Sequence, residues 1–239
     1  MRVLLLILLA TTAFGQALSF DVASVRPNTL NDRIVTIDPG PGGRFSARGY
    51  SLKLLIQYAY DVKGFQVQGG PNWLDADRFD IAARGDSSAT PDQLRLMMQA
   101  LLADRFALRV QKIQKEMAGF ELLVAGTQAK LKPSTTAEEN PGSSRRIGQA
   151  LVSNSITMAT FAKFMGAYLA KPVVDNTGIR GLYDITLSWN ERADQVPDAG
   201  SAGVSLISAL RDQLGLKLTA KKVMADVIAV ESAQKASGN

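Results

Sequence analysis

One sequence pattern occurs twice in this chain, once over residues 44–125 and once over residues 150–231. Similar short segments recur in the same order at offsets of 104 to 108 residues; matched positions are Ser51 with Thr157, Asp80 with Asp184, and Asp104 with Asp212. A duplication followed by small insertions and deletions in loops leaves such offsets, and a chance likeness of two α/β units is the alternative. The duplication predicts two tandem units with the same fold.

The pattern within each copy predicts an α+β unit of order β-α-β-β-α-β-β, in which two helices cover one face of a small sheet. In the first copy, Ser51 and Thr90 are typical helix N-caps, and Pro91 suits the first helical position. We expect strands there at 45–50, 65–68, 78–83, 106–110 and 119–124, with helices beginning at residues 52 and 91. In the second copy we expect strands at 151–154, 173–175, 182–187, 216–219 and 223–230, with helices at 157–169 and 204–214.

The segments outside the two copies differ in character. Residues 16–43 form an N-terminal region in which 18–26 and 34–37 are expected to make a strand pair. Residues 126–149, rich in Ser, Thr, Pro, Gly, Lys and Glu, predict a linker, and residues 232–239 predict a polar tail. The polar loop 190–203 is long for a compact unit, so we expect it to be disordered, with a functional loop as the alternative.

The N-terminus has the three regions of a secretory signal peptide. Arg2 precedes an apolar run over residues 3–10, and small residues follow before position 16. We expect residues 1–15 to be removed by cleavage after Gly15, or alternatively after Ala17, giving an exported protein in the periplasm or the medium. The apolar run is shorter than the ~20 residues that cross a bilayer, so an uncleaved anchor is the weaker alternative, and we expect no membrane span elsewhere.

The chain contains no cysteine and no histidine, which excludes several kinds of chemistry. Disulfide bonds, lipid attachment to an N-terminal cysteine, Ser-His-Asp triads, Cys-His pairs and the usual zinc sites all require those residues. Carboxylate, hydroxyl, lysine and arginine chemistry remains. We therefore expect no cofactor.

The formal net charge is +5, and the basic residues are dispersed along the chain. The densest basic positions, Arg145 with Arg146 and Lys221 with Lys222, are not interleaved with the aromatic side chains on which nucleic-acid bases stack. We therefore expect no nucleic-acid partner. An envelope protein or a cell-wall component is the expected kind of partner, and a weak attraction to anionic envelope surfaces stays open.

Asp75, Asp77 and Asp80 make the densest carboxylate cluster. A calcium loop would need a glycine and a terminal glutamate that are missing here, so a turn before a strand explains the cluster better, and we expect no metal. Asp80 and its counterpart Asp184 are expected to bond a neighbouring turn, one in each copy. The alternative is an enzyme acting on envelope polymers, with a carboxylate pair drawn from Asp75, Asp77, Asp175 and Asp184.

The most distinctive run is PVVDNTGIRGLYD at residues 172–184. Its asparagine and glycines suit turns with positive φ. A binding surface at this run would use Asp175, Asn176, Thr177, Gly178, Arg180, Gly181, Tyr183 and Asp184. A demanding turn without a ligand is the alternative.

Four segments of the sequence resemble an uncharacterised soil-associated bacterial family of exported proteins: FDVASVRP at 20–27, LLADRFAL at 101–108, GFELLV at 119–124 and VVDNTGIRGLYD at 173–184. The resemblance covers nearly the whole chain after the signal segment. It implies an unknown function and no established catalytic residues, and the same module is attached to some membrane metallopeptidases of the antirepressor type that sense β-lactams. Family members often carry a basic-aromatic or histidine residue where this chain has Gln111.

The order β-α-β-β-α-β is also similar to the short N-terminal domain of secretins and TonB-dependent receptors, a non-enzymatic module of envelope assembly and signalling. This similarity rests on topology, and a shared fold does not fix function. Together with the absence of a complete catalytic set, it favours an exported, non-catalytic binding or protein-interaction module of the bacterial cell envelope. The alternatives are the carboxylate-dependent hydrolase and a solute-binding sensor domain, which would need a sizeable apolar pocket between the copies.

Overall fold

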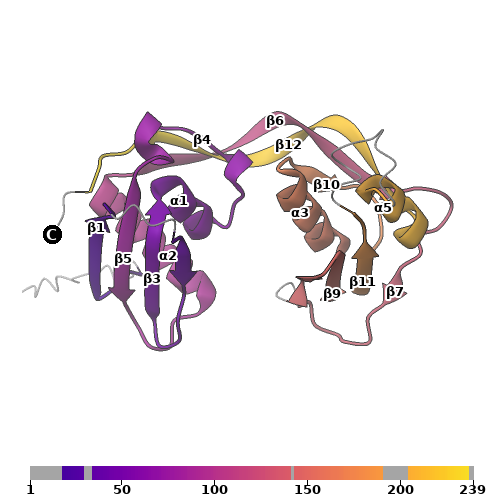
Figure 1. Ribbon diagram of the computed structural model, residues 1–239, viewed down its shortest axis with the longest axis horizontal. Helices are drawn as coiled ribbons and strands as arrows, with labels where there is room; N and C mark the ends of the chain where they lie inside the picture. Colours follow the sequence, from indigo (N-terminus) through magenta and orange to yellow (C-terminus); the bar gives the residue numbers. More distant parts are fainter. Residues whose placement is uncertain (1–17, 30–33, 141–142, 191–203, 237–239) are drawn as a thin grey trace, which may run out of the picture. The chain divides into compact units, whose positions relative to one another are not determined.

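The computed structural model describes residues 18–29, 34–140, 143–190 and 204–236 (Figure 1). Within these ranges the chain forms four helices and three four-stranded sheets, which confirms the expected α+β class. The chain divides into two compact units. Of the described residues, the first unit contains those up to Val62, Gly69–Gln111 and those from Ala229 onward, and the second contains Lys63–Gln68 and Lys112–Ile228. The predicted signal segment and most of the loop 190–203 lie outside the described residues.

The first sheet has the strand order β1-β5-β3-β2, and each neighbouring pair is antiparallel. Its strands are β1 (Val22–Pro27), β2 (Thr36–Asp38), β3 (Arg44–Ser51) and β5 (Arg78–Arg84). The expected pairing of the two N-terminal strands with each other is wrong, because β1 and β2 occupy opposite edges of this sheet. The Pro-Gly run at 39–43 joins β2 to β3 as a hairpin, while β1 pairs with β5 and buries Val25 opposite Ile81.

Helices α1 (Leu52–Tyr60) and α2 (Pro91–Phe106) follow β3 and β5 in the chain. The predicted caps are confirmed. The Ser51 hydroxyl accepts a hydrogen bond from the Leu54 amide at 3.3 Å, and Thr90 and Gln93 form a reciprocal capping box. The rigid φ of Pro91 suits the first turn of α2.

Both helices cover the same face of the first sheet. Phe45 of β3 lies 5.0 Å from the ring of Tyr58 in α1, and Phe79 of β5 lies 4.9 Å from the ring of Phe106 in α2. Phe45, Phe79 and Phe106 are all buried. Because side chains alternate along a strand, the residues between these positions point to the opposite, helix-free face.

The second sheet has the order β7-β11-β9-β8 and is also antiparallel throughout. Its strands are β7 (Lys132–Pro133), β8 (Arg145–Ile147), β9 (Ala150–Ile156) and β11 (Tyr183–Ser188). When β9 and β11 are matched to β3 and β5, β7 matches β1 and β8 matches β2. The predicted linker at 126–149 therefore supplies both edge strands of this sheet. Its polar composition concealed them, because the side chains of β7 and β8 are exposed and only their backbones need partners.

Helices α3 (Met158–Leu169) and α5 (Leu206–Leu214) occupy the expected places after β9 and β11. Thr157, which was expected to begin the helix, caps α3, and Ser205 caps α5. The apolar sides of both helices enter one core with the inward residues of the second sheet. The largest buried members of that core include Phe161, Met165 and Trp189.

A third sheet has the order β10-β6-β12-β4. It contains β4 (Val67–Gly69), β6 (Arg109–Val124), β10 (Val173–Asp175) and β12 (Leu216–Ser232). The prediction of two strands at the end of each copy is wrong, because β6 and β12 are each continuous. Residues 111–118 and 220–222 are mostly polar but contain no glycine or proline, so no strand-breaking residue interrupts them. These strands also join each other instead of the sheets of their own copies, and the tandem duplication stays a prediction.

The predicted tail does not extend freely from β12 over its described part. The Gln234 amide donates to the Phe106 carbonyl at 2.7 Å, and Lys235 lies 2.6 Å from Asp77. Ala236 is buried. Among the described helices, none combines the length and the apolar character needed to cross a bilayer.

Candidate functional site

Asp80 holds a bulge in the first sheet. The pairing of β3 with β5 shifts register between Ala47 and Tyr50, where Gly49 adopts a positive φ of 65°. The Gly49 amide donates to Asp80 Oδ1 at 2.8 Å, and the Asn28 side chain donates to the same oxygen at 2.7 Å. The carboxylate therefore stabilises a backbone irregularity just before the N-terminus of α1.

Asp184 makes the equivalent contact in the second sheet. Ser155 has a positive φ of 53°, and its amide donates to Asp184 Oδ1 at 3.1 Å. Ser134 also bonds this carboxylate, and Lys132 Nζ lies 3.4 Å from it. The Ser155 amide is the main cause of a pKa for Asp184 below its usual value. Asp80 and Asp184 thus bond neighbouring backbone, as predicted, each within its own sheet.

The run 175–178 forms a turn that uses its own side chains as partners. Asp175 Oδ1 accepts from the Thr177 amide at 3.0 Å and from its hydroxyl at 2.8 Å, and the Thr177 hydroxyl accepts from the Ile179 amide. Asn176 donates to the side chain of Glu121 in β6. Gly178 has a positive φ of 69°, a conformation that glycine adopts without the steric cost of a Cβ.

The rest of the predicted binding run belongs to the approach to β11. Gly181 has a positive φ of 107°, and the Tyr183 hydroxyl donates to the Arg180 carbonyl at 3.1 Å. Tyr183 itself pairs with Ile156 of β9 and Pro133 of β7. The eight predicted residues therefore build a turn and a strand start, and a ligand-binding role for them stays a prediction.

The other candidate carboxylates have lysine partners in the first unit. Asp75 accepts from Ser51 at 3.3 Å and lies 3.4 Å from Lys53 Nζ, while Asp77 pairs with Lys235. Across the described ranges, no group of three or more acidic side chains is arranged to hold a metal ion. Each candidate carboxylate thus has a local structural partner.

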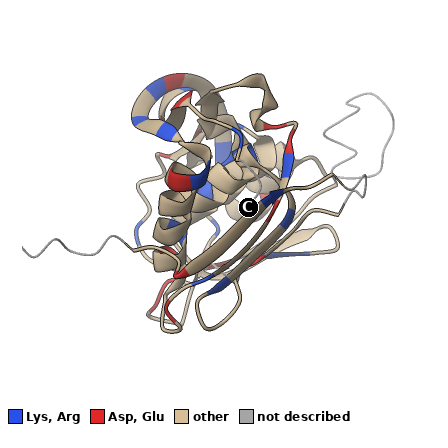
Figure 2. Cartoon of the chain, turned by 90° about the vertical axis from the view of Figure 1, so that its left-hand side faces the viewer, with Lys and Arg blue, Asp and Glu red and all other residues tan. Residues whose placement is uncertain are grey.

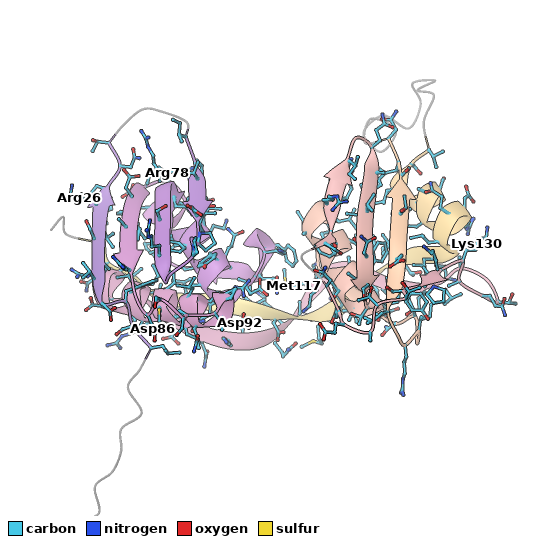
Figure 3. All side chains as sticks on the ribbon, turned by 90° about the horizontal axis from the view of Figure 1, so that it is seen from below. Arg26, Arg78, Asp86, Asp92, Met117 and Lys130 are labelled. Atoms are coloured by element: carbon cyan, nitrogen blue, oxygen red, sulfur yellow. The ribbon has the colours of Figure 1, made fainter. Side chains whose placement is uncertain are left out.

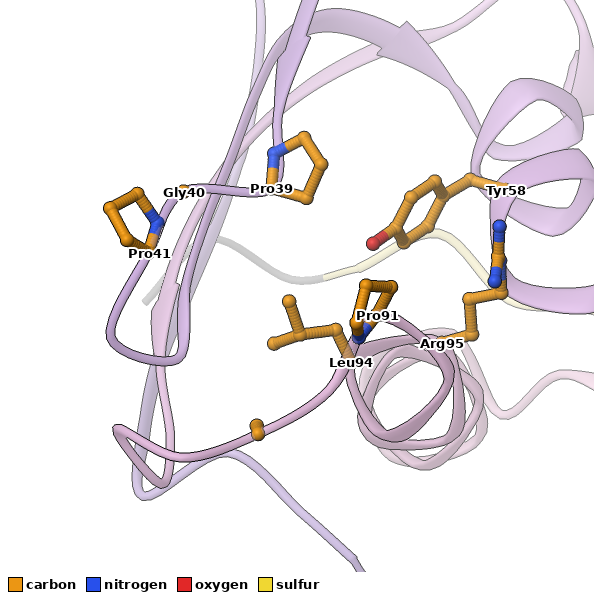
Figure 4. Close-up of a pocket in the computed structure, with 8 residues that line it drawn as sticks. Pro39, Gly40, Pro41, Tyr58, Pro91, Leu94 and Arg95 are labelled. Atoms are coloured by element: carbon orange, nitrogen blue, oxygen red, sulfur yellow. The ribbon is translucent and has the colours of Figure 1, made fainter. Parts of the chain in front are cut away.

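A pocket of about 320 Å³ opens in the first unit, between the loop after β2 and the helices α1 and α2 (Figure 4). Its lining consists of three prolines and a few mostly apolar neighbours: Pro39, Gly40, Pro41, Tyr58, Ala89, Pro91, Leu94 and Arg95. Figure 4 shows the Tyr58 hydroxyl pointing into the space between Pro39 and Pro91. The pocket is therefore apolar with a few polar groups, the usual chemistry of a ligand site.

Two polar groups give the pocket its hydrogen-bonding capacity. Burial raises the pKa of Tyr58, and the positive charge of Arg95 partly offsets that rise, so the phenol stays protonated and can donate at neutral pH. Arg95 lies 2.6 Å from Asp92 and 3.8 Å from Asp61. Both carboxylates are mostly exposed, so these pairs contribute little and a ligand carboxylate could replace them at small cost.

The pocket adjoins an open sheet edge. Pro39 directly follows β2, which is the last strand in the order of the first sheet, and Ile34 and Val35 before it are about half exposed. The sequence indicated only a loop at 38–43, since the run of Pro and Gly residues fits a turn. Pro39 and Pro41 were the sequence signal that could have pointed to the pocket, because they fix the backbone of the loop that forms one of its walls.

A family model described as a protein of unknown function (DUF3738) matches residues 53–233. The match begins at Lys53 in α1, so it covers the first copy of the sequence pattern from that residue onward and the whole of the second. No curated protein and no solved structure matches the chain.

Proposed function

The chain belongs to a family of proteins of unknown function (DUF3738), and we propose from its geometry that it is an exported, non-catalytic binding module of the bacterial cell envelope. Its partner is an extended segment of an envelope protein that pairs with β2 and places one side chain in the adjacent pocket. The observation that carries this proposal is the position of the pocket beside the free edge of the first sheet.

The physical basis is strand addition. An edge strand presents backbone N–H and C=O groups that a second chain can pair with, and a neighbouring pocket then selects a side chain. Beyond β2, no described strand continues the first sheet. Exposed Ile34 and Val35 extend the apolar surface next to this edge. Export is proposed from the signal-like segment 1–15, and the likeness to short secretin domains supports a role in envelope assembly or signalling.

A solute-binding sensor is the second candidate, and the pocket volume favours it. About 320 Å³ lies near the lower end of the roughly 300–1,000 Å³ that is typical of small-molecule sites. Such a solute would fill the pocket without pairing with β2. Thermal-shift screening against small metabolites, in the absence of any partner, distinguishes the two candidates.

Photo-crosslinking in the producing cell tests the strand-addition proposal. A benzophenone amino acid at Val35, beside β2, should capture a protein partner, whereas the same probe at Ile147 should not. Ile147 is a matched control because it is also exposed and lies on β8, the edge strand that matches β2 in the second sheet. Equal capture from both positions, or none from Val35, contradicts the proposal.

A second variant tests the pocket itself. Ala89→Trp places a large side chain at the pocket wall, and Ala76→Trp places one at an exposed position of the same unit outside the lining. We expect Ala89→Trp to suppress the crosslink from Val35 and Ala76→Trp to leave it unchanged.

A further inference from the structure

Five arginines lie on the helix-free face of the first sheet. Each directly precedes or follows a buried residue in its own strand, and all five are exposed: Arg26 of β1, Arg44 and Arg48 of β3, and Arg78 and Arg84 of β5. We call this surface the arginine face. Figure 3 shows Arg26 and Arg78 at the same end of the sheet, and Figure 2 marks the basic residues of the chain in blue.

The strand register arranges these arginines on two sides of a row of small residues. Arg44 lies directly opposite Arg84 at one end, while Arg26 lies opposite Asp80 toward the other end. Between them, Ser24, Ala82 and Ser46 are paired with one another across three strands. The row runs perpendicular to the strands, with ~4.8 Å between neighbouring strands.

The matched sheet of the second unit provides an internal comparison. Its register is the same: Ala150 pairs with Ser188 as Arg44 pairs with Arg84, and Val152 pairs with Thr186 as Ser46 pairs with Ala82. At the positions that correspond to the arginines of β3 and β5, the second sheet has neutral residues: Ala150, Asn154, Leu182 and Ser188. The shared sheet architecture therefore does not require arginine at these four positions, whereas the position of Arg26 is occupied by the basic Lys132.

Arg48 makes an interaction of its own, whereas the other four arginines of this face lack an acidic partner among the described residues: Arg26, Arg44, Arg78 and Arg84. Two carboxylates lie on the same face: Asp80 is already bonded by the Gly49 amide and by Asn28, and exposed Asp38 pairs with Ser46 at the β2 end of the small row. Like charges directly opposite one another on neighbouring strands are destabilising, so an anion between them relieves a cost already present in the fold.

We propose that the arginine face binds a linear polysaccharide that carries carboxylate groups. A guanidinium matches a carboxylate with two parallel hydrogen bonds, and all five positions are arginine and none is lysine. The strand spacing is comparable with the length of a sugar unit. A chain along the small row would have Arg44 and Arg84 on one side, and Arg26 and Arg48 with Asp80 between them on the other. Uronic-acid polymers offer one carboxylate per sugar, alternately on the two sides of an extended chain.

Two other anionic partners fit the face less well. The register positions that form it carry no aromatic side chain, and Tyr50 pairs with Phe79 on the helix-covered side. Single-stranded nucleic acid is held mainly by stacking on aromatic rings. Bilayer surfaces are usually bound with several aromatic or apolar anchors as well as charge, and the large apolar side chain that this face exposes is Val22, opposite Arg84. The inference goes beyond the proposed partner segment at β2, since it concerns a different surface.

The test uses the purified chain and oligogalacturonate of defined length in a calorimetric titration. The wild type should bind, binding should weaken as salt rises, and the methyl-esterified oligomer should not bind. The double variant Arg44→Ala with Arg84→Ser copies the second sheet and should weaken binding about tenfold. A control variant with the same net charge, Lys163→Ser with Arg211→Ser, should bind within about twofold of the wild type.

Several results overturn the proposal. Among them are no binding of oligogalacturonate by the wild type, equal binding of the esterified oligomer, and an equal loss in the control variant. Binding of phosphatidylglycerol vesicles or duplex DNA in its place also overturns it. Arg44→Lys with Arg84→Lys keeps the charge but removes the bidentate geometry, so its affinity for oligogalacturonate should fall between those of the wild type and the neutral variant. This variant tests the proposal even if the neutral variant folds poorly. The crosslink from Val35 reports on the β2 proposal separately.

Discussion

The carboxylate of Asp184 should contribute measurably to the stability of the second unit. Its Oδ1 accepts the amide of Ser155, whose residue is only 2% exposed, and Asp184→Ala leaves that amide without its partner. An unsatisfied buried donor costs about 1–3 kcal/mol. The Lys132 ion pair adds little, because the lysine side chain is 76% exposed. We expect Asp184→Ala to lower the free energy of unfolding by about 2 kcal/mol.

Asp184→Asn is the matched control, since its amide oxygen can still accept from the Ser155 backbone. It should cost less than about 1 kcal/mol, because the hydrogen bond is kept and only the charge is lost. The measurement is denaturant unfolding followed by tryptophan fluorescence. The chain has two tryptophans, Trp73 in the first unit and Trp189 in the second, so a Trp73→Phe background reports on the second unit alone.

The same bond predicts a dependence on pH. The folded pKa of Asp184 is below its ordinary value of 3.8, so its stabilising contribution is fully present above that value and is lost as pH falls through the folded pKa. Asp184→Asn should remove this part of the acid sensitivity. If Asp184→Ala costs less than about 0.5 kcal/mol, or if the Asn variant costs as much as the Ala variant, the role assigned to this carboxylate is wrong.

Three further substitutions test the backbone and the second core by the same unfolding measurement. Gly49 and Gly178 share a positive φ near 65–69°. A Cβ at Gly49 would lie 2.3 Å from the Ile34 carbonyl oxygen, whereas Gly178 faces open space. Gly49→Ala should therefore be severely destabilising, and Gly178→Ala should lower the free energy of unfolding by about 1 kcal/mol. Tyr168→Phe removes the hydroxyl that accepts the buried Trp189 indole N–H at 2.9 Å. It should lower the free energy of unfolding by about 1–2 kcal/mol and shift the Trp189 emission. An unchanged emission spectrum would contradict that hydrogen bond.

The sequence predicted the helices and inner strands of the fold, because their signals are local. Ser51 and Thr90 cap helices where their side chains indicated, and the alternation around Phe79 correctly identified a half-buried strand. The edge strands were harder to recognise. The exposed side chains of β8 have no apolar pattern, and its place in the sheet is set by backbone pairing with β9, which leaves no mark on composition.

The candidate surfaces needed the structure for a different reason. Pro39, Tyr58 and Arg95 lie far apart in the sequence, and only the meeting of a hairpin loop with two helices makes them one pocket. Likewise, Arg44 and Arg84 are unremarkable as single surface charges, and their significance comes from direct opposition across β3 and β5. Register is a long-range property that single-strand periodicity does not supply.

Comparison of the two sheets separates the residues that the fold needs from those it leaves free. Asp80 and Asp184 occupy matched positions and hold matched bulges, so substitution there should damage structure in either unit. Arg84 and Ser188 also occupy matched positions, yet one is charged and the other neutral in the same antiparallel setting. A residue that the architecture does not dictate, and that adds like-charge repulsion where it stands, requires an explanation outside folding. A ligand that neutralises the first sheet provides one, and it predicts that copying the second sheet's residues onto the first will reduce binding while leaving stability equal or improved.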